Sequence, residues 1–206
     1  MRDFNDKRPD DIGCDNIWEL YRITPQVRAI GFAHYLEGTD IWFVMDSDCG
    51  APRITMIIPL PDSAVGCIES CIWFFKHEAE VRTYYPKPVA EICEESEHKG
   101  EFLRLLNFFN ARVYPDQTDG GAGSAEPQLY FAPRFYITED GGFDITATTF
   151  VNYQIWDTVH AIHDYIIHYC PEILSNLAPY VVGVLKGVLT AEEAIERIET
   201  ELMGIE

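Results

Sequence analysis

The chain has 206 residues, of which 47% are hydrophobic, enough to fill the core of one generous domain and to exclude wholesale disorder. Fifteen Lys and Arg residues against thirty-four Asp and Glu residues give a net charge of −19. Such a surface repels phosphate backbones and anionic lipid headgroups, so we expect neither nucleic-acid nor membrane binding, whereas basic protein surfaces are open as partners.

The sequence predicts a polar N-terminal lead over residues 1–13 and a single domain over residues 14–206. The lead has no apolar stretch after its basic residues, and no run approaches the roughly 18–20 apolar residues of a membrane-spanning helix. The six cysteines are scattered without dense spacing, which favours a reducing cytoplasm over a disulfide scaffold. We therefore expect a cytoplasmic protein.

The first predicted elements are a short helix over residues 15–23, which ends at Thr24-Pro25, and three strands. Apolar alternation with a period of two begins at Val27 and predicts strands over residues 27–36, 41–45 and 53–60. Tight turns between them indicate an antiparallel meander.

The sequence pattern of residues 65–85 fits either a helix or strands. Two aromatic and β-branched stretches within this segment favour strands, although the spacing of some apolar residues also fits one helical face. Residues 89–112 predict a single helix, whose acidic run over 91–101 is typical of a solvated face.

The remaining predicted elements begin with an exposed, glycine-rich loop over residues 115–128. A hairpin over 129–138 and 143–150 comes next, and then a helix capped by Asn152 that ends at Pro171, a helix over 177–186, and a helix over 191–203 opened by the capping box of Thr190 and Glu193. These elements predict an α+β fold: an antiparallel sheet of about five strands, with helices mainly on one face and a helical C-terminal extension.

Four residues with metal-ligating side chains share one stripe of the helix after Asn152, because they are spaced three, four and four apart: Asp157, His160, Asp164 and His168. Such a stripe can supply imidazole and carboxylate ligands to a metal-dependent hydrolase. The opposite stripe is apolar, however, as in an ordinary amphipathic helix with a solvated polar face. No Asp follows Asp164 to complete a buried His-Asp metal site, so we assign no metal, cofactor or catalytic residue.

Adjacent aromatic residues recur in the predicted strands, notably Trp42-Phe43 and Trp73-Phe74-Phe75. Neighbours in a strand point to opposite faces, so each pair places one ring on each side of the sheet. Either both faces are covered within the domain, or the second face is a dimer interface or a peptide-binding surface. The candidate protein-contact residues are Trp42, Trp73, Phe74 and Phe75.

The C-terminal half resembles the YbjN-type family, whose fold is that of type III secretion chaperones. Residues 169–198 are similar to that family's ending, in which a helix containing Pro179 runs into the apolar stretch 184–187 and then into the helix start at 190–195. Asn107 and Asn110 match its L-N-x-x-N helix. The resemblance spans residues 100–200 and, more loosely, 14–60.

This resemblance implies a small acidic protein that binds other proteins, often as a homodimer, in a chaperone-like or regulatory role without catalytic residues. We therefore predict a non-enzymatic protein-binding module that needs no cofactor and binds a protein partner or a second copy of itself. Two alternatives stay open: the metal-dependent hydrolase, and an acidic inhibitor that imitates nucleic acid.

Overall fold

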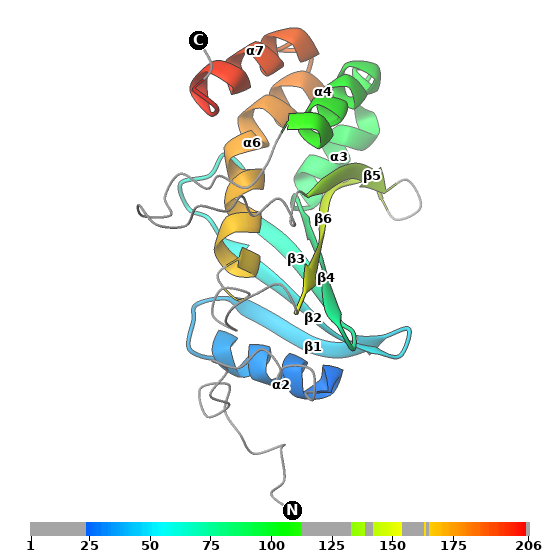
Figure 1. Cartoon of the computed structure of the whole chain (residues 1–206). Coiled ribbons are helices and arrows are strands. Elements are labelled where there is room, and N and C mark those ends of the chain that lie inside the picture. Colours follow the sequence, from blue (N-terminus) through cyan, green and yellow to red (C-terminus); the bar gives the residue numbers. More distant parts are fainter. Residues whose placement is uncertain (1–23, 113–132, 139–141, 154–162, 164, 205–206) are drawn as a thin grey trace, which may run out of the picture.

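The computed structural model describes residues 24–112, 133–138, 142–153, 163 and 165–204. Six antiparallel strands form one sheet in the order β1-β2-β3-β4-β6-β5 (Figure 1). The strands are β1 (Trp42–Asp48), β2 (Ala51–Pro59), β3 (Cys67–Phe74), β4 (Glu78–Tyr84), β5 (Arg134–Thr138) and β6 (Asp144–Asn152). The helices are α2 (Pro25–Leu36), α3 (Lys87–Glu95), α4 (Lys99–Arg112), the π-helical turn η4 (Tyr165–Tyr169), α6 (Cys170–Leu185) and α7 (Ala191–Glu201). The predicted α+β class is confirmed, with six strands in place of about five.

The strand predicted from Val27 is wrong, because this segment is helix α2. The Thr24 side chain accepts a hydrogen bond from the backbone N–H of Val27 at 3.3 Å, and Pro25 lies in the first turn, where a missing N–H costs nothing. The buried positions follow helical rather than alternate spacing: Ala29, Phe32, Ala33 and Leu36. Three predicted segments lie outside the described residues: the polar lead over 1–13, the helix over 15–23 and the loop over 115–128.

Residues 65–85 form strands β3 and β4, as favoured, and these two strands, with the strand over 27–36 lost to α2, bring the sheet to six. The single helix predicted over residues 89–112 is instead two helices that are separated at Ser96, whose backbone is extended. The Ser96 hydroxyl donates a hydrogen bond to the carbonyl oxygen of Leu185 at 2.6 Å, so the break is tied to the end of α6. Helices α3 and α4 can therefore cover different parts of the sheet.

The C-terminal helices differ from the prediction mainly in where they begin. Pro171 lies in the first turn of α6 and does not end a helix, and the predicted helix over 177–186 is the second half of α6. The capping box is confirmed: the Thr190 hydroxyl accepts from the Glu193 N–H at 3.2 Å, and the Glu193 carboxylate accepts from the Thr190 N–H at 2.8 Å.

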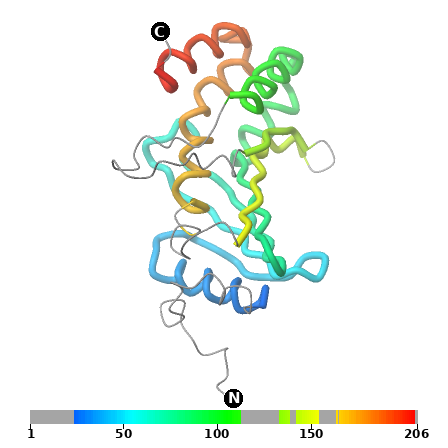
Figure 2. The backbone as a smooth tube through the Cα atoms, viewed as in Figure 1, coloured from blue at the N-terminus to red at the C-terminus, as the bar shows by residue number. Residues whose placement is uncertain are grey.

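The helices pack on one face of the sheet, which we call the inner face. It carries alternate residues of each strand, such as Ile54 and Met56 in β2 and Ile68 and Ile72 in β3, and these are at most 1% exposed. Two hydrophobic clusters cover it: one beneath α2 and η4, the other beneath α3, α4, α6 and α7. Figure 2 shows α2 at one end of the sheet and α3, α4 and α7 at the other, with η4 and α6 running between them. Among the described residues, no helix is long and apolar enough to cross a membrane.

Candidate functional site: the outer face of the sheet

The opposite side of the sheet, which we call the outer face, is built from the remaining alternate positions of its strands. Strand register places these side chains in rows that run from β1 to β5. The outer face comprises Trp42, Val44, Asp46, Asp48, Arg53, Thr55, Ile57, Cys67, Glu69, Cys71, Trp73, Glu78, Glu80, Arg82, Tyr84, Arg134, Tyr136, Thr138, Asp144, Thr146, Thr148, Phe150 and Asn152.

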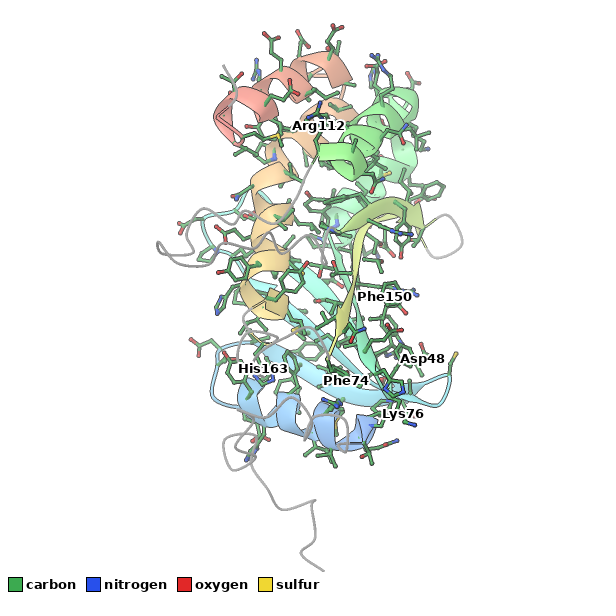
Figure 3. All side chains as sticks on the ribbon, viewed as in Figure 1. Asp48, Phe74, Lys76, Arg112, Phe150 and His163 are labelled. Atoms are coloured by element: carbon green, nitrogen blue, oxygen red, sulfur yellow. The ribbon has the colours of Figure 1, made fainter. Side chains whose placement is uncertain are left out.

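None of these outer-face side chains belongs to either hydrophobic cluster of the described structure. In Figure 3, Asp48 and Phe150 lie on the side of the sheet away from α6, whereas His163 lies close to α2. Phe150 is 49% exposed although it stands within a strand of nine residues. The two sides of the sheet therefore differ: one is filled by helices, and the other, although Cys71, Thr146 and Thr148 on it are buried, presents exposed side chains along β1 and at Phe150.

An exposed apolar patch lies where the outer face meets the edge strand β1. Trp42 and Ile57 stand directly opposite each other in the β1–β2 register, and Val44 is the next outward residue of β1. Their exposed fractions are 59% for Trp42, 38% for Ile57 and 44% for Val44. We call these three residues the Trp42 patch. Contiguous exposed side chains of this size and type are typical of binding surfaces rather than of scattered surface positions.

Trp73 lies near the end of β3 on the outer face, between two arginines. The Arg53 guanidinium carbon lies 5.8 Å from the centre of the Trp73 ring, and that of Arg82 lies 4.8 Å from it. Both distances are within the range of a cation–π interaction. The indole Nε1 donates a hydrogen bond to Asp48 Oδ2 at 3.0 Å. The tryptophan is thus fixed from three sides.

The two arginines are in turn held by carboxylates. Arg53 donates from Nε and Nη2 to the two oxygens of Asp46 at 2.9 and 2.7 Å, a bidentate pair, and its Nη1 lies 3.3 Å from Asp48 Oδ2. Arg82 donates to Glu80 at 2.7 Å. The hydrogen bond from Trp73, followed by one from Cys49, holds the pKa of Asp48 below its ordinary value, and Arg53 does the same for the pKa of Asp46. In this part of the face two arginines are paired with three carboxylates, which leaves one net negative charge.

A second group of contacts ties the neighbouring rows together. The Cys71 thiol lies 3.0 Å from the Tyr84 hydroxyl and 3.3 Å from the Thr55 hydroxyl, and the Tyr136 hydroxyl lies 2.9 Å from that of Thr148. Burial and the contact with Cys71 raise the pKa of Tyr84 well above its ordinary value. The Tyr84 hydroxyl therefore remains neutral at physiological pH and acts as a structural link.

Glu69, unlike the carboxylates just described, takes part in no ion pair, and among the described residues the same is true of Glu78 and Asp144. Glu69 lies in the same row as Trp42 and Ile57, between Ile57 of β2 and Tyr84 of β4. Partial burial raises the pKa of Glu69, and the negative charge of Asp144 adds to that effect. The site therefore contains a carboxylate in an environment that disfavours its charge.

The four predicted contact residues occupy different environments. Trp42 and Trp73 lie on the outer face, and Phe75, directly after β3, is 37% exposed. Phe74 is 5% exposed and packs in the core with its ring centre 6.0 Å from that of Phe32, because it alternates with Trp73 along the strand. We therefore place Phe74 in the core and not in the contact surface.

The sequence reasoning missed Ile57 and Glu69 as parts of the site. Residues 53–57 and 67–73 show the alternation of a strand, which indicates that Ile57 and Glu69 each lie on one face. The sequence does not give the register of β1–β2 and β2–β3, and only that register brings both residues beside Trp42.

Of the predicted metal-type residues, Asp157, His160 and Asp164 lie outside the described residues. His168 is exposed on η4. Within the described part of the chain, no group of three or more His, Cys, Asp or Glu side chains could hold a metal ion. The five cysteines that the structure describes are free: Cys49, Cys67, Cys71, Cys93 and Cys170.

Comparison with known proteins identifies no relative of this chain. No protein-family model matches the chain, and neither does any curated protein or any solved structure. The resemblance to the YbjN-type family stays a prediction.

Proposed function

We propose that this protein is a non-enzymatic protein-binding module, chaperone-like or regulatory, that binds its partner through the outer face of the sheet. One observation carries the proposal: the inner face is filled by helices, while the outer face presents the exposed Trp42 patch beside a fixed network of aromatic and charged side chains. Apolar anchors beside an ordered polar surround are typical of protein interfaces.

The charge of this face favours a different protein over a second copy as the partner. Six carboxylates lie on the outer face (Asp46, Asp48, Glu69, Glu78, Glu80 and Asp144) together with three arginines (Arg53, Arg82 and Arg134). Two copies that met through this face would bring the same excess of negative charge together, which opposes association. The homodimer expected from the sequence needs another surface, whereas a partner with basic residues is attracted.

The experiment that tests this proposal is gentle purification of the tagged protein from its own host, followed by native mass spectrometry. Trp42→Glu is compared with the wild type and with Leu103→Glu. Leu103 is a matched control because it is 52% exposed on α4, away from the sheet's outer face, and the substitution introduces the same charge.

The wild type and the Leu103→Glu variant are expected to carry a second polypeptide, and Trp42→Glu is expected to lose it while its circular dichroism is unchanged. Equal retention by both variants would contradict the proposal, because the partner would then bind elsewhere. A preparation in which the wild type carries no second polypeptide would also contradict it.

A further inference from the structure

The row of side chains that joins the Trp42 patch to Glu69 points to the chemistry of the partner. We infer that this row binds a lysine or arginine side chain of a basic partner segment, with the aliphatic stem on Trp42 and Ile57 and the cationic head at Glu69. This inference rests on the proposed function and deepens it by naming the partner as a basic polypeptide.

The geometry of the row fits a long cationic side chain. Trp42, Ile57, Glu69 and Tyr84 are consecutive partners in the registers of β1–β2, β2–β3 and β3–β4. Neighbouring strands are about 4.8 Å apart, so a Lys or Arg side chain about 6–7 Å long, with its head at Glu69, lays its stem over Ile57 and reaches the near edge of the Trp42 ring. These side chains lay their methylene groups on apolar surface and keep the charged head at a polar group.

Three outer-face carboxylates (Glu69, Glu78 and Asp144) take part in no ion pair among the described residues, and of these Glu69 is the one in the row of Trp42 and Ile57. Asp46 and Asp48 are paired with Arg53, and Glu80 is paired with Arg82. Glu69 has no such ion-pair partner among the described residues, and Asp144 adds a second negative charge nearby. An incoming ammonium or guanidinium group would relieve this repulsion and form a charge-assisted hydrogen bond.

Aromatic groups at both ends of the row strengthen the preference for a cation. Trp42 is 59% exposed at one end, and Tyr84 lies at the other. The faces of such rings attract ammonium and guanidinium groups. The same face already holds two arginines near Trp73, at 5.8 and 4.8 Å from its ring centre. An aromatic group beside a carboxylate is therefore a combination that this sheet already uses to hold cations.

The test uses two synthetic heptapeptides as probes, one alternating Val and Lys and the other alternating Val and Glu, titrated calorimetrically into the full chain. Glu69→Gln is compared with Glu97→Gln, which removes one negative charge from an exposed position between α3 and α4. Glu69→Asp keeps the charge and serves as the conservative variant. Thermal unfolding of each variant shows that it is folded.

We expect the Lys peptide to bind and the Glu peptide not to bind. Glu69→Gln should weaken binding of the Lys peptide at least tenfold. Glu97→Gln should weaken it by less than twofold, and Glu69→Asp by only a few-fold. Equal binding of both peptides, or equal weakening by Glu69→Gln and Glu97→Gln, would overturn the inference, because net charge alone would then explain the binding.

The failure of this inference and the failure of the proposed function give different results. If a neutral or acidic protein co-purifies in a Trp42-dependent manner and the Lys peptide does not bind, the proposed function stands and the basic partner is overturned. If co-purification does not depend on Trp42, the proposed function is overturned whatever the peptides do.

Discussion

Trp73 in β3 and Asp48 in β1 are joined by a hydrogen bond of 3.0 Å although strand β2 lies between them. Arg53 of β2 contacts both residues: its Nη1 is 3.3 Å from Asp48 Oδ2, and its guanidinium carbon is 5.8 Å from the centre of the Trp73 ring. Side chains from three successive strands thus form one unit. This unit orders the outer face beside the Trp42 patch.

Trp73→Phe tests the contribution of the indole N–H. The substitution keeps an aromatic ring near Arg53 and Arg82 but removes the hydrogen-bond donor to Asp48. That hydrogen bond is the largest of the causes that lower the pKa of Asp48. We expect the pKa of Asp48 to rise toward its ordinary value, as measured by NMR titration of the side-chain carboxyl carbon. An unchanged pKa would show that Arg53 and Cys49 suffice to hold the carboxylate.

The free energy of unfolding should fall in acid, because Asp46 and Asp48 are stabilised in their ionised form in the folded chain. The pKa values of Asp46 and Asp48 in the folded chain lie below the ordinary value of 3.8, so the stabilisation is complete above about pH 5 and is lost as the pH falls through the folded pKa values. Denaturant unfolding between about pH 6 and about pH 2.5 measures this loss. It should be smaller in Trp73→Phe; an equal loss would contradict the role assigned to the indole.

Glu69 and Glu80 should respond in opposite ways to loss of their charge. Glu69 has a raised pKa because it is partly buried near Asp144, and a hydrogen bond from the Lys87 backbone offsets this only in part. Its ionised form therefore destabilises the fold at pH 7, and the destabilisation is relieved as the pH falls through the raised pKa. Glu80 holds Arg82 at 2.7 Å.

Urea unfolding at pH 7 should find Glu69→Gln at least as stable as the wild type and Glu80→Gln less stable, because only the second substitution breaks an ion pair. A reversed order would show that Glu69 is well paired in solution.

The two faces of the sheet should differ in their tolerance of truncation. Ile72 of the inner face is fully buried, so Ile72→Ala should lower the free energy of unfolding by about 3 kcal/mol. Ile57 of the outer face is 38% exposed, and Ile57→Ala should cost less than about 1 kcal/mol. Equal losses in denaturant unfolding would mean that something covers the outer face as tightly as the helices cover the inner one.

Gly187 is a position where the backbone, rather than the available space, sets the cost of a side chain. Its φ of +68° is one that L residues rarely adopt, so Gly187→Ala should destabilise the protein by about 1–2 kcal/mol. An added Cβ would also meet the His98 ring, but that ring is exposed and can swing aside. His98→Ala should therefore restore little stability to Gly187→Ala.

Gly100 is the matched control for Gly187. It lies in α4 with ordinary helical backbone and nothing within 4 Å of an added Cβ. Gly100→Ala should stabilise the protein by about 0.5 kcal/mol through helix propensity. Thermal unfolding of both variants checks the pair, and destabilisation by Gly100→Ala would contradict the packing described for α4.

Several elements were predictable from the sequence because local chemistry determines them. Thr190 and Glu193 are sufficient to start α7, and the turn residues after β1 require φ values that Gly50 readily adopts. The sequence predicts a strand where α2 lies, because the apolar residues of this segment match both periods over a short stretch and Thr24-Pro25 fits the end of one helix as well as the start of the next. A proline that opens a helix and a proline that ends one are distinguished only by the spacing of the apolar residues on either side.

The candidate site was only partly predictable. The aromatic pairs indicate that one ring faces each side, but they do not say which side the helices cover, so Phe74 and Trp73 could not be separated before the structure. Glu69 becomes part of the site only through the pairing of β2 with β3. Such juxtapositions depend on register, which is set by the whole sheet rather than by any short segment.

Site-specific photo-crosslinking in the native host tests the central claim most directly. A photoreactive amino acid is placed at Trp42 or, as a control, at Leu103, both of which are more than half exposed. We predict a discrete adduct with one other protein from position 42 and none of the same mass from position 103. No adduct from position 42, or the same adducts from both positions, would contradict it.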